Sequence, residues 1–416
     1  MSSPTCILAV GSALRPQINI DRSLVLGTGA FGSIYAANWR DDKSDAALAV
    51  KVVDHSTLSA KAQAQLKREV ELHMSVDNQF LLRCHGAYEA DSRTMHLVLD
   101  RMVGDVASAI RVTAPSVRTL APRLLGELLH ALHHLHESAG IVHADIKPAN
   151  LLLDEHAALR LCDLGAACRL QQGAGGRTTL VGSPAYLAPE VVAISHLGLD
   201  VSGGASYAHS ADVWSSGVCL VEMLTGGGLP FAAEPRDPAA QPSAICFRPP
   251  ALVPAGAFSA RARAVALRLL AKQSYLRPSA REVLEGEGAF EGGAAGEHGY
   301  LRHDPAQAES MQAAARACVA ALAARGADEL EPLFARSAAI CSPTPPPPPP
   351  PGPISTPVSG GAHGQYGGGG KERGHVADEA TTTPMGSSSG GSSGATDDES
   401  PMSLPSWTSS LVEQSP

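Results

Sequence analysis

The chain has 416 residues, of which 32 are Lys or Arg and 41 are Asp or Glu, giving a formal net charge of −9. Because this balance is acidic and no long basic run occurs, composition argues against a nucleic-acid-binding protein. Eight scattered cysteines, without a CxxC pair or zinc-binding spacing, argue against a disulfide-stapled or zinc-stabilised fold.

The apolar segments are too short for membrane insertion or secretion. No stretch approaches the roughly 20 apolar residues that a membrane span needs, and the run Cys6–Val10 is shorter than a signal-peptide core. We therefore expect no membrane span, reduced thiols, and a location in the cytoplasm, the nucleus or both.

Strand-like segments come first along the chain, and helix-like segments follow. Leu48–Val53 and Met95–Leu99 are short apolar runs typical of half-buried strands. Residues 122–136 and 260–272 instead place apolar side chains at helical spacing. This order predicts an α+β protein with a sheet-rich small lobe followed by a larger helical lobe.

Composition also sets the expected boundaries. We expect a flexible segment at 1–22, a small lobe at about 23–101 and a large lobe at about 102–290. Residues 291–340 are Ala-rich with a weak helical pattern, which is compatible with one isolated amphipathic helix.

The last part of the chain has the composition of a disordered tail. Residues 341–416 are rich in Pro, Gly and Ser and cannot bury enough apolar surface to offset the cost of ordering. The run Pro345–Pro351 favours polyproline II, which SH3, WW or profilin-like modules recognise. A simple spacer is an equal alternative.

A glycine-rich segment gives the first chemical signal. It reads Leu26, Gly27, Thr28, Gly29, Ala30, Phe31, Gly32, Ser33 and Ile34. A plain hairpin or a dinucleotide-binding turn can have the same spacing. Because residues 33–37 resemble a strand and not a helix, the pattern favours a strand, a loop and a strand around a triphosphate, which backbone N–H groups can approach where no Cβ intervenes.

A lysine and a glutamate follow at positions where they could meet that triphosphate. Lys51 lies within an apolar strand, where a lone cation is costly to bury, although an exposed edge-strand lysine is the alternative. Glu69 lies on a predicted helix, three or four residues from Leu66, Leu72 and His73, so it should face the core and hold Lys51.

The strongest local signal is the segment Ile141–Leu153, in which Asp145 and Asn150 have the spacing of a kinase catalytic loop. Together with the glycine loop, this segment resembles eukaryotic-type serine/threonine protein kinases. The resemblance implies the bilobal kinase fold, ATP and Mg²⁺ as cofactors, and protein substrates. It also implies that Asp145 accepts the substrate hydroxyl proton and that Lys147 contacts the transferring phosphate.

Further motifs extend the resemblance over about residues 24–290. Asp163 begins an Asp-Leu-Gly triplet, which alone could be an ordinary turn, but its position implies that Asp163 and Asn150 hold Mg²⁺. The motifs Gly182–Glu190, Ser210–Val218 and Leu276–Ser279 follow in kinase order. By resemblance, structural roles fall to His143, Asp212, and a buried ion pair of Glu190 with Arg277.

The adenine-binding slot is also assigned by resemblance. Met95–Met102 is similar to the strand and hinge of a kinase, so Leu99 would be the gatekeeper, with the backbone of Asp100 to Met102 facing adenine. The side chains that would sandwich the purine are Ile34, Ala49 and Leu152.

The activation loop departs from the usual pattern. Thr178, Thr179 and Ser183 are its hydroxyl residues, and residues 177–182 resemble Aurora-type mitotic kinases, with Thr179 in the place of their activating threonine. Ala144, however, replaces the arginine that commonly grips a phosphorylated loop residue. We therefore predict a weaker dependence on loop phosphorylation.

His73 is a second departure, since kinases usually have an apolar residue there. It could weaken helix positioning or confer pH sensitivity, or it could simply be a hydrogen-bonded interior histidine. Acidic Asp105 and Glu127 give a slight indication of basic peptide substrates.

Three functions compete. An active serine/threonine kinase is favoured over a nucleotide-binding pseudokinase scaffold because Lys51, Asp145 and Asp163 are all present. It is favoured over a small-molecule kinase because Gly182–Glu190 resembles a platform for peptide substrates.

Overall fold

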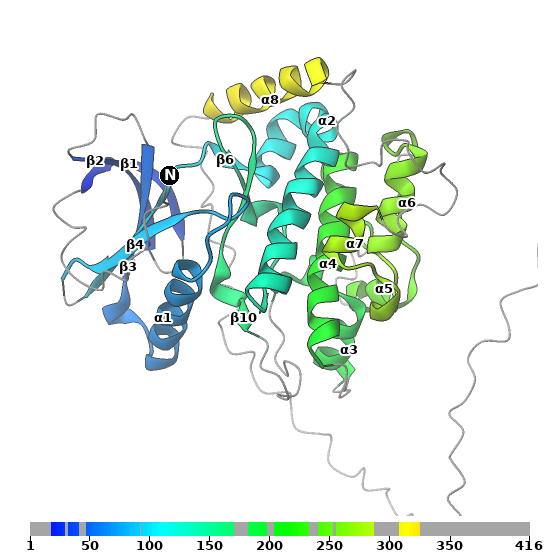
Figure 1. Ribbon diagram of the computed structural model, residues 1–416, viewed down its shortest axis with the longest axis horizontal. Helices are drawn as coiled ribbons and strands as arrows, with labels where there is room; N and C mark the ends of the chain where they lie inside the picture. The colour runs from blue at the N-terminus through cyan, green and yellow to red at the C-terminus, as the bar shows by residue number, and fades with distance from the viewer. Residues whose placement is uncertain are drawn as a thin grey trace, which may run out of the picture. The chain divides into compact units, whose positions relative to one another are not determined.

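The computed structural model describes residues 18–29, 32–40, 47–91, 93–169, 182–197, 204–232, 240–252, 255–286 and 308–324. A sheet-rich part comes first and a helical part follows, which confirms the predicted α+β architecture (Figure 1). Ala30, Phe31, Thr178 and Thr179 lie outside the described residues, as does the tail 341–416 with its proline run.

Five antiparallel strands form the N-terminal sheet, in the order β1-β2-β3-β5-β4. They are β1 (Ile18–Gly29), β2 (Gly32–Trp39), β3 (Ala47–Asp54), β4 (Cys84–Glu89) and β5 (Thr94–Asp100). The glycine segment therefore lies between two strands, not before a helix. At the start of β2, a Cβ on Gly32 would lie 1.8 Å from the carbonyl oxygen of Val52, so only glycine fits there.

The sheet starts earlier in the chain than we expected. Residues 18–22, assigned above to a flexible segment, belong to β1. Ile18 is 4% exposed and packs with Leu48 and Val50. The alternation of Ile18 and Ile20 with polar neighbours is that of a half-buried strand, but it is too short to stand out in the sequence.

Helix α1 (Ala60–Met74) packs against β4 and carries Glu69. Ser59 caps its N-terminus by accepting a hydrogen bond from the N–H of Ala62. The buried residues Leu66, Leu72 and His73 set the inward face of the helix.

Two long helices, α2 (Val106–His133) and α4 (Gly204–Thr225), pack together in the C-terminal part. α2 bends at Thr113, where the backbone leaves the helical conformation just before Pro115. The fully buried leucines of α2 are Leu120, Leu124, Leu125, Leu128, Leu129 and Leu132. The shorter helices are α3 (Pro189–Leu197), α5 (Gln241–Phe247), α6 (Ala260–Leu269) and α7 (Ala280–Glu285).

Two small sheets carry the loops of the candidate site. One contains β6 (Gly104–Asp105), β8 (Leu151–Leu153) and β9 (Leu159–Leu161), and the other pairs β7 (Ile141–Val142) with β10 (Cys168–Arg169). The turn between β7 and β8 holds Asp145 and Asn150, while Asp163 follows β9.

A buried ion pair ties α3 to the loop between α6 and α7. Arg277 Nη1 and Nη2 donate to Glu190 Oε1 and Oε2 at 2.6 and 2.7 Å. The same guanidinium donates to the carbonyls of Ala271, Lys272 and Ser210. Because the buried charge has a bidentate partner and its other donors are satisfied, this pair can brace the helical part.

The Ala-rich extension contains helix α8 (Ala308–Ala323), which is not isolated. It packs on α2, and Cys318 and Leu322 belong to the main hydrophobic core (Figure 1). The weak helical pattern of this segment does not reveal its partner, because small residues leave only a narrow apolar stripe. None of the helices in the described segments is both long and apolar enough to cross a membrane.

Candidate active site

Lys51 and Glu69 meet between β3 and α1. Lys51 Nζ donates to Glu69 Oε1 at 2.8 Å, while Glu71, two residues further, is exposed. Burial by itself lowers the pKa of Lys51, but the carboxylates of Glu69 and Asp163 outweigh burial and raise the pKa above its ordinary value. The side chain therefore presents a permanent positive charge beside Asp163.

The glycine segment spans the junction of β1 and β2. Gly27 pairs with Ile34, Thr28 with Ser33, and Gly29 with Gly32 across the two strands. Because Ile34 also pairs with Lys51 on β3, the glycine segment and the lysine belong to neighbouring strands of one sheet. Leu26 is half-buried and precedes Gly27 on β1.

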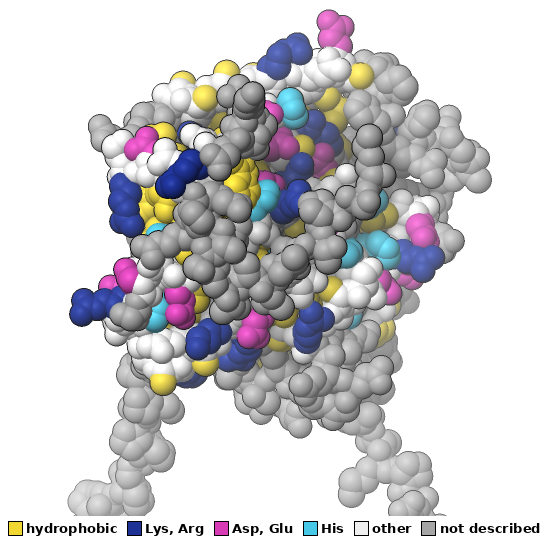
Figure 2. Space-filling view, turned by 60° about the vertical axis from the view of Figure 1, so that its left-hand side comes forward, with side chains coloured by type: hydrophobic (Ala, Val, Ile, Leu, Met, Phe, Trp, Pro, Cys, Tyr) yellow, Lys and Arg dark blue, Asp and Glu magenta, His cyan; other side chains and the backbone are white. Residues whose placement is uncertain are grey.

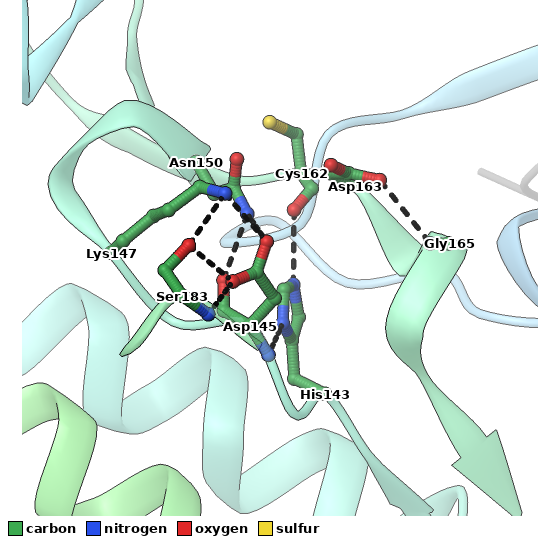
Figure 3. A network of polar contacts seen from close by, with 8 residues as sticks. All are labelled: His143, Asp145, Lys147, Asn150, Cys162, Asp163, Gly165 and Ser183. Atoms are coloured by element: carbon green, nitrogen blue, oxygen red, sulfur yellow. Dashed lines mark hydrogen bonds and ion pairs between the residues drawn. The ribbon is translucent and has the colours of Figure 1, made fainter. Parts of the chain in front are cut away.

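Asp145 is the centre of a buried polar network (Figure 3). Its Oδ1 accepts hydrogen bonds from the backbone N–H and the hydroxyl of Ser183 at 3.0 and 2.9 Å. Its Oδ2 accepts from Lys147 Nζ at 2.7 Å and from Asn150 Nδ2 at 3.2 Å. These contacts fix the plane of the carboxylate and bring together three residues that the sequence predicted, with Ser183 as their partner.

The backbone of the same loop is held from α4. Asp212 accepts hydrogen bonds from the N–H groups of His143 and Ala144, each at 2.8 Å, and lies 2.9 Å from His136 Nε2. Burial alone would raise the pKa of Asp212, but the contact with His136 and the backbone donor of His143 hold it below the ordinary value. Ala144 has φ +66°, a strained conformation for a residue with a side chain, so Asp212 anchors a strained turn.

His143 joins this loop to the chain around Asp163. Its Nε2–H donates to the carbonyl of Cys162 at 2.9 Å, and its Nδ1 accepts from the N–H of Asp145 at 3.3 Å (Figure 3). The N–H of Cys162 donates to the carbonyl of Asn150 at 3.0 Å. One imidazole therefore sets the relative positions of Asp145 and Asp163.

Asn150 and Asp163 offer oxygens suited to a hard cation. Asn150 Nδ2 donates to the Asp145 backbone oxygen at 2.8 Å, which directs its amide nitrogen inward and leaves the amide oxygen as the group for a metal. Asp163 has φ +68°, and its Oδ1 accepts from the N–H of Gly165 at 3.2 Å. These residues fit Mg²⁺, which takes few protein oxygens and prefers phosphates and water for the rest. Within the described segments, no group of three or more His, Cys, Asp or Glu side chains could hold a metal by itself.

The residues assigned to the adenine slot lie in and beside one apolar cluster. Leu99, Leu152 and Cys162 are buried in it, and Met102 packs against it. Ala49 pairs with Leu99 across β3 and β5, and both Ala49 and Ile34 are buried. Such a surface can bind a flat ring by burial and shape.

The carboxylate of Asp100 does not face this slot freely. It lies 2.7 Å from His85 Nε2, and the backbone N–H of Asp100 donates to the carbonyl of Arg83. The carboxylate and the backbone N–H of Asp100 are therefore both engaged within the protein.

Two contacts of the site join segments that lie far apart in the sequence. Ser183 bonds Asp145 across 38 residues, and Gln65 Nε2 donates to the carbonyl of Gly165 at 3.0 Å, tying α1 to the Asp163 loop. Gln65 lies one turn before Glu69 on the same helix, which is the one sequence signal that could have identified it.

Asp105 and Glu127 are structural and do not form an acidic substrate surface. Asp105 caps α2 by accepting from the N–H of Ser108 at 2.7 Å. Glu127 accepts from the N–H of Leu159 at 2.8 Å, and burial raises the pKa of its carboxyl group. These two carboxylates therefore give no support to a preference for basic peptide substrates.

One face of the molecule is mixed in charge. Figure 2 shows acidic and basic side chains close together on one face, with hydrophobic side chains among them. Among the described side chains of this face, no uniformly basic area of the kind that binds nucleic-acid phosphates is visible.

Comparison with known proteins places this geometry in a family. Residues 21–287 match the family model described as protein kinase domain. The chain is 32% identical over 228 residues to ribosomal protein S6 kinase 2 alpha of Xenopus laevis, a match that covers 54% of this chain and 29% of that protein.

Two further relatives are similar over about half of the chain. Human ribosomal protein S6 kinase alpha-1 is 33% identical over 215 residues, covering 51% of this chain and 27% of its own length. The Drosophila melanogaster serine/threonine-protein kinase fused is 29% identical over 211 residues, covering 51% of this chain and 24% of its own length. The chain thus spans less than a third of these relatives, and it belongs to the protein kinase family.

Proposed function

We propose that this protein is a serine/threonine protein kinase that transfers the γ-phosphoryl group of ATP to hydroxyl groups of proteins. The observation that carries the proposal is the arrangement of Lys147 and Ser183 around the Asp145 carboxylate, at 2.7 Å and 2.9 Å. In this arrangement the aspartate can orient a hydroxyl group, and the ammonium group beside it can neutralise the negative charge of an incoming phosphoryl group.

The binding half of the mechanism belongs to the N-terminal sheet. Backbone N–H groups of the glycine segment would cover the phosphates, and Lys51, held by Glu69 at 2.8 Å, would bind their oxygens. Asn150 and Asp163 would hold Mg²⁺, which neutralises charge on the β- and γ-phosphates when bound. The apolar cluster around Leu99 would take the adenine ring.

The reacting half belongs to the loop between β7 and β8. The substrate hydroxyl oxygen would attack the γ-phosphorus while its proton passes to the Asp145 carboxylate, and the bond between the γ-phosphorus and the bridging oxygen would break, releasing ADP. Lys147 Nζ, 2.7 Å from Asp145, would then stabilise the negative charge of the group in transfer. Serine/threonine preference is supported by Lys147 at this position and by the name of the Drosophila melanogaster relative, a serine/threonine-protein kinase.

Radiolabel transfer from ATP to generic protein substrates tests this function. Asp145→Asn should reduce turnover by about 10²- to 10⁴-fold with nearly unchanged ATP binding, because Asp145 acts on the nucleophile. Lys51→Met should weaken both turnover and binding. Glu155→Gln, whose side chain is 81% exposed, is the matched surface control and should retain wild-type activity.

The alternative, a pseudokinase that binds nucleotide without efficient transfer, gives a different result. It predicts Mg²⁺-dependent ATP binding with the same background signal in wild type and Asp145→Asn. That outcome would remove the proposed mechanism while leaving the nucleotide site intact.

A further inference from the structure

Helix α8 lies outside the matched kinase residues 21–287, yet it has a buried face. Met311, Ala314, Cys318 and Leu322 are between 0 and 9% exposed and recur at helical spacing. An isolated helix of this length is marginal in water. The helix therefore depends on the surface that covers this stripe, which is α2.

The two ends of α8 have different neighbours. At its last turn, Leu322 lies against Gly104 of β6, where a Cβ would be 3.0 Å from Leu322 Cδ2 and 3.2 Å from Cδ1. The backbone of Gly104 is not in the left-handed region, so a side chain there would be disfavoured by its close approach to Leu322 and not by backbone conformation. Leu322 and Gly104 thus form a close contact between α8 and β6, which we call the seat.

β6 connects this seat to the nucleotide site. Gly104 follows Met102 of the hinge by two residues, and β6 pairs with β8 so that Asp105 lies opposite Leu152 of the adenine slot. The N–H of Val103 donates to the carbonyl of Leu153 at 2.8 Å. Asp105 then caps α2, so hydrogen bonds hold β6 on both sides.

We infer that α8 is a positioning element for nucleotide binding, acting through the contact of Leu322 with Gly104. The helix fixes β6, and β6 fixes the hinge and Leu152. The inference rests on the proposed function, since it concerns the affinity of the same site for ATP. It makes residues 308–324 part of the working kinase domain, beyond the end of the matched family region.

The test compares two truncations on the same face of α8 in the full chain. Leu322→Ala removes the seat, and Met311→Ala removes a similarly buried side chain 322 − 311 = 11 residues away, roughly 16 Å along the helix. Both should lower Tm by roughly 5 to 15 °C. Only Leu322→Ala should raise KM for ATP, by roughly 3- to 10-fold, with kcat nearly unchanged. Equal KM changes in both variants, or none in either, would overturn the inference.

A second variant pair probes the seat directly. Gly104→Ala places a methyl group within 3.0 to 3.4 Å of Leu322 and should also raise KM for ATP. In the double variant Gly104→Ala/Leu322→Ala the methyl group enters vacated space, so the KM change should be smaller than the product of the single changes. If the KM change of the double variant equals the product of the two single changes, the two residues act independently. That result would contradict the proposed contact of Leu322 with Gly104.

Failure of this inference can be told apart from failure of the proposed function. Calorimetric binding of Mg²⁺–ATP and hydrogen exchange of the amides of residues 103–106 need no phosphoryl transfer. If wild type binds but does not transfer, the function fails while the comparison of Leu322→Ala with Met311→Ala remains decisive. Unchanged affinity and unchanged exchange in Leu322→Ala would reject the positioning role in an active kinase.

Discussion

The hydrogen bonds of the catalytic loop centre on the two carboxylate oxygens of Asp145. Asp145 accepts from the Ser183 hydroxyl on one oxygen and from Lys147 and Asn150 on the other. Each partner fixes a different degree of freedom of the side chain, so losing one would leave the others bonded but less well aligned. The network explains why conservative changes at Asp145 should affect turnover more than folding.

A second residue-scale feature lies behind the catalytic loop, where two histidines stack. The rings of His136 and His209 are 4.3 Å apart at 17°, and His136 also lies 2.9 Å from Asp212 Oδ2. Burial, followed by the neighbouring His136, lowers the pKa of His209 from 6.5 to about 4. Asp212 and Glu137 are the acidic groups that partly oppose this shift.

His209 therefore predicts a pH dependence of stability. Between pH 6.5 and about 4 the unfolded chain binds a proton at His209 that the folded chain does not, so this group makes stability fall as pH drops through that window. His209→Gln should flatten the fall in Tm, measured by thermal unfolding at several pH values. His156→Gln, with a side chain 80% exposed, should keep the wild-type slope. An unaltered slope in His209→Gln would disprove the assignment.

At the scale of elements, contacts of a single arginine hold the chain around β10. Ala144 stands where an arginine is usual, and Arg169 of β10 donates to the carbonyl of Ala139 and to Ser75 Oγ, each at 2.8 Å. The end of the activation segment is instead attached to the catalytic loop by Ser183. Because Arg169 is bonded to other parts of the protein, its contacts support the prediction that activity depends only weakly on phosphorylation of the activation loop.

The double variant Thr178→Ala/Thr179→Ala tests this dependence. Without an arginine beside Asp145 to bind a phosphate, the variant should retain at least about half of wild-type activity, because a lost phosphate would remove no charge-assisted bond from that position. Activity is measured before and after phosphatase treatment of wild type. Loss of activity in the variant, together with loss on phosphatase treatment, would contradict the expectation.

How far the sequence predicts these elements depends on the range of the contacts involved. The position of Glu69 on the inward face of α1 follows from local helical spacing, and the glycine segment lies between strands because its neighbours are β-branched or aromatic. The docking of α8, the bond of Ser183 and the tie from Gln65 are contacts between distant segments. Local patterns can mark Ser183 and Gln65 as candidates, but they do not specify these bonds, since each bond depends on the folded arrangement.

At the scale of the whole molecule, the proposed chemistry needs groups from both parts of the kinase domain. Lys51 and Glu69 come from the N-terminal sheet and its helix, whereas Asp145, Asn150 and Asp163 come from loops that the helical part holds. Gln65 and the charge interaction of Lys51 with Asp163 connect the two parts. The central claim is that these residues converge on one magnesium nucleotide.

Calorimetric titration of the folded, full-length chain with ATP tests that claim most directly. We predict binding that requires Mg²⁺, since Asn150 and Asp163 reach the phosphates only through the metal, and a loss of affinity of about tenfold or more in Asp163→Asn. Glu155→Gln should bind as wild type does. A folded wild-type protein that takes up no ATP in the presence of Mg²⁺, or that binds equally well without it and with Asp163→Asn, would contradict the account.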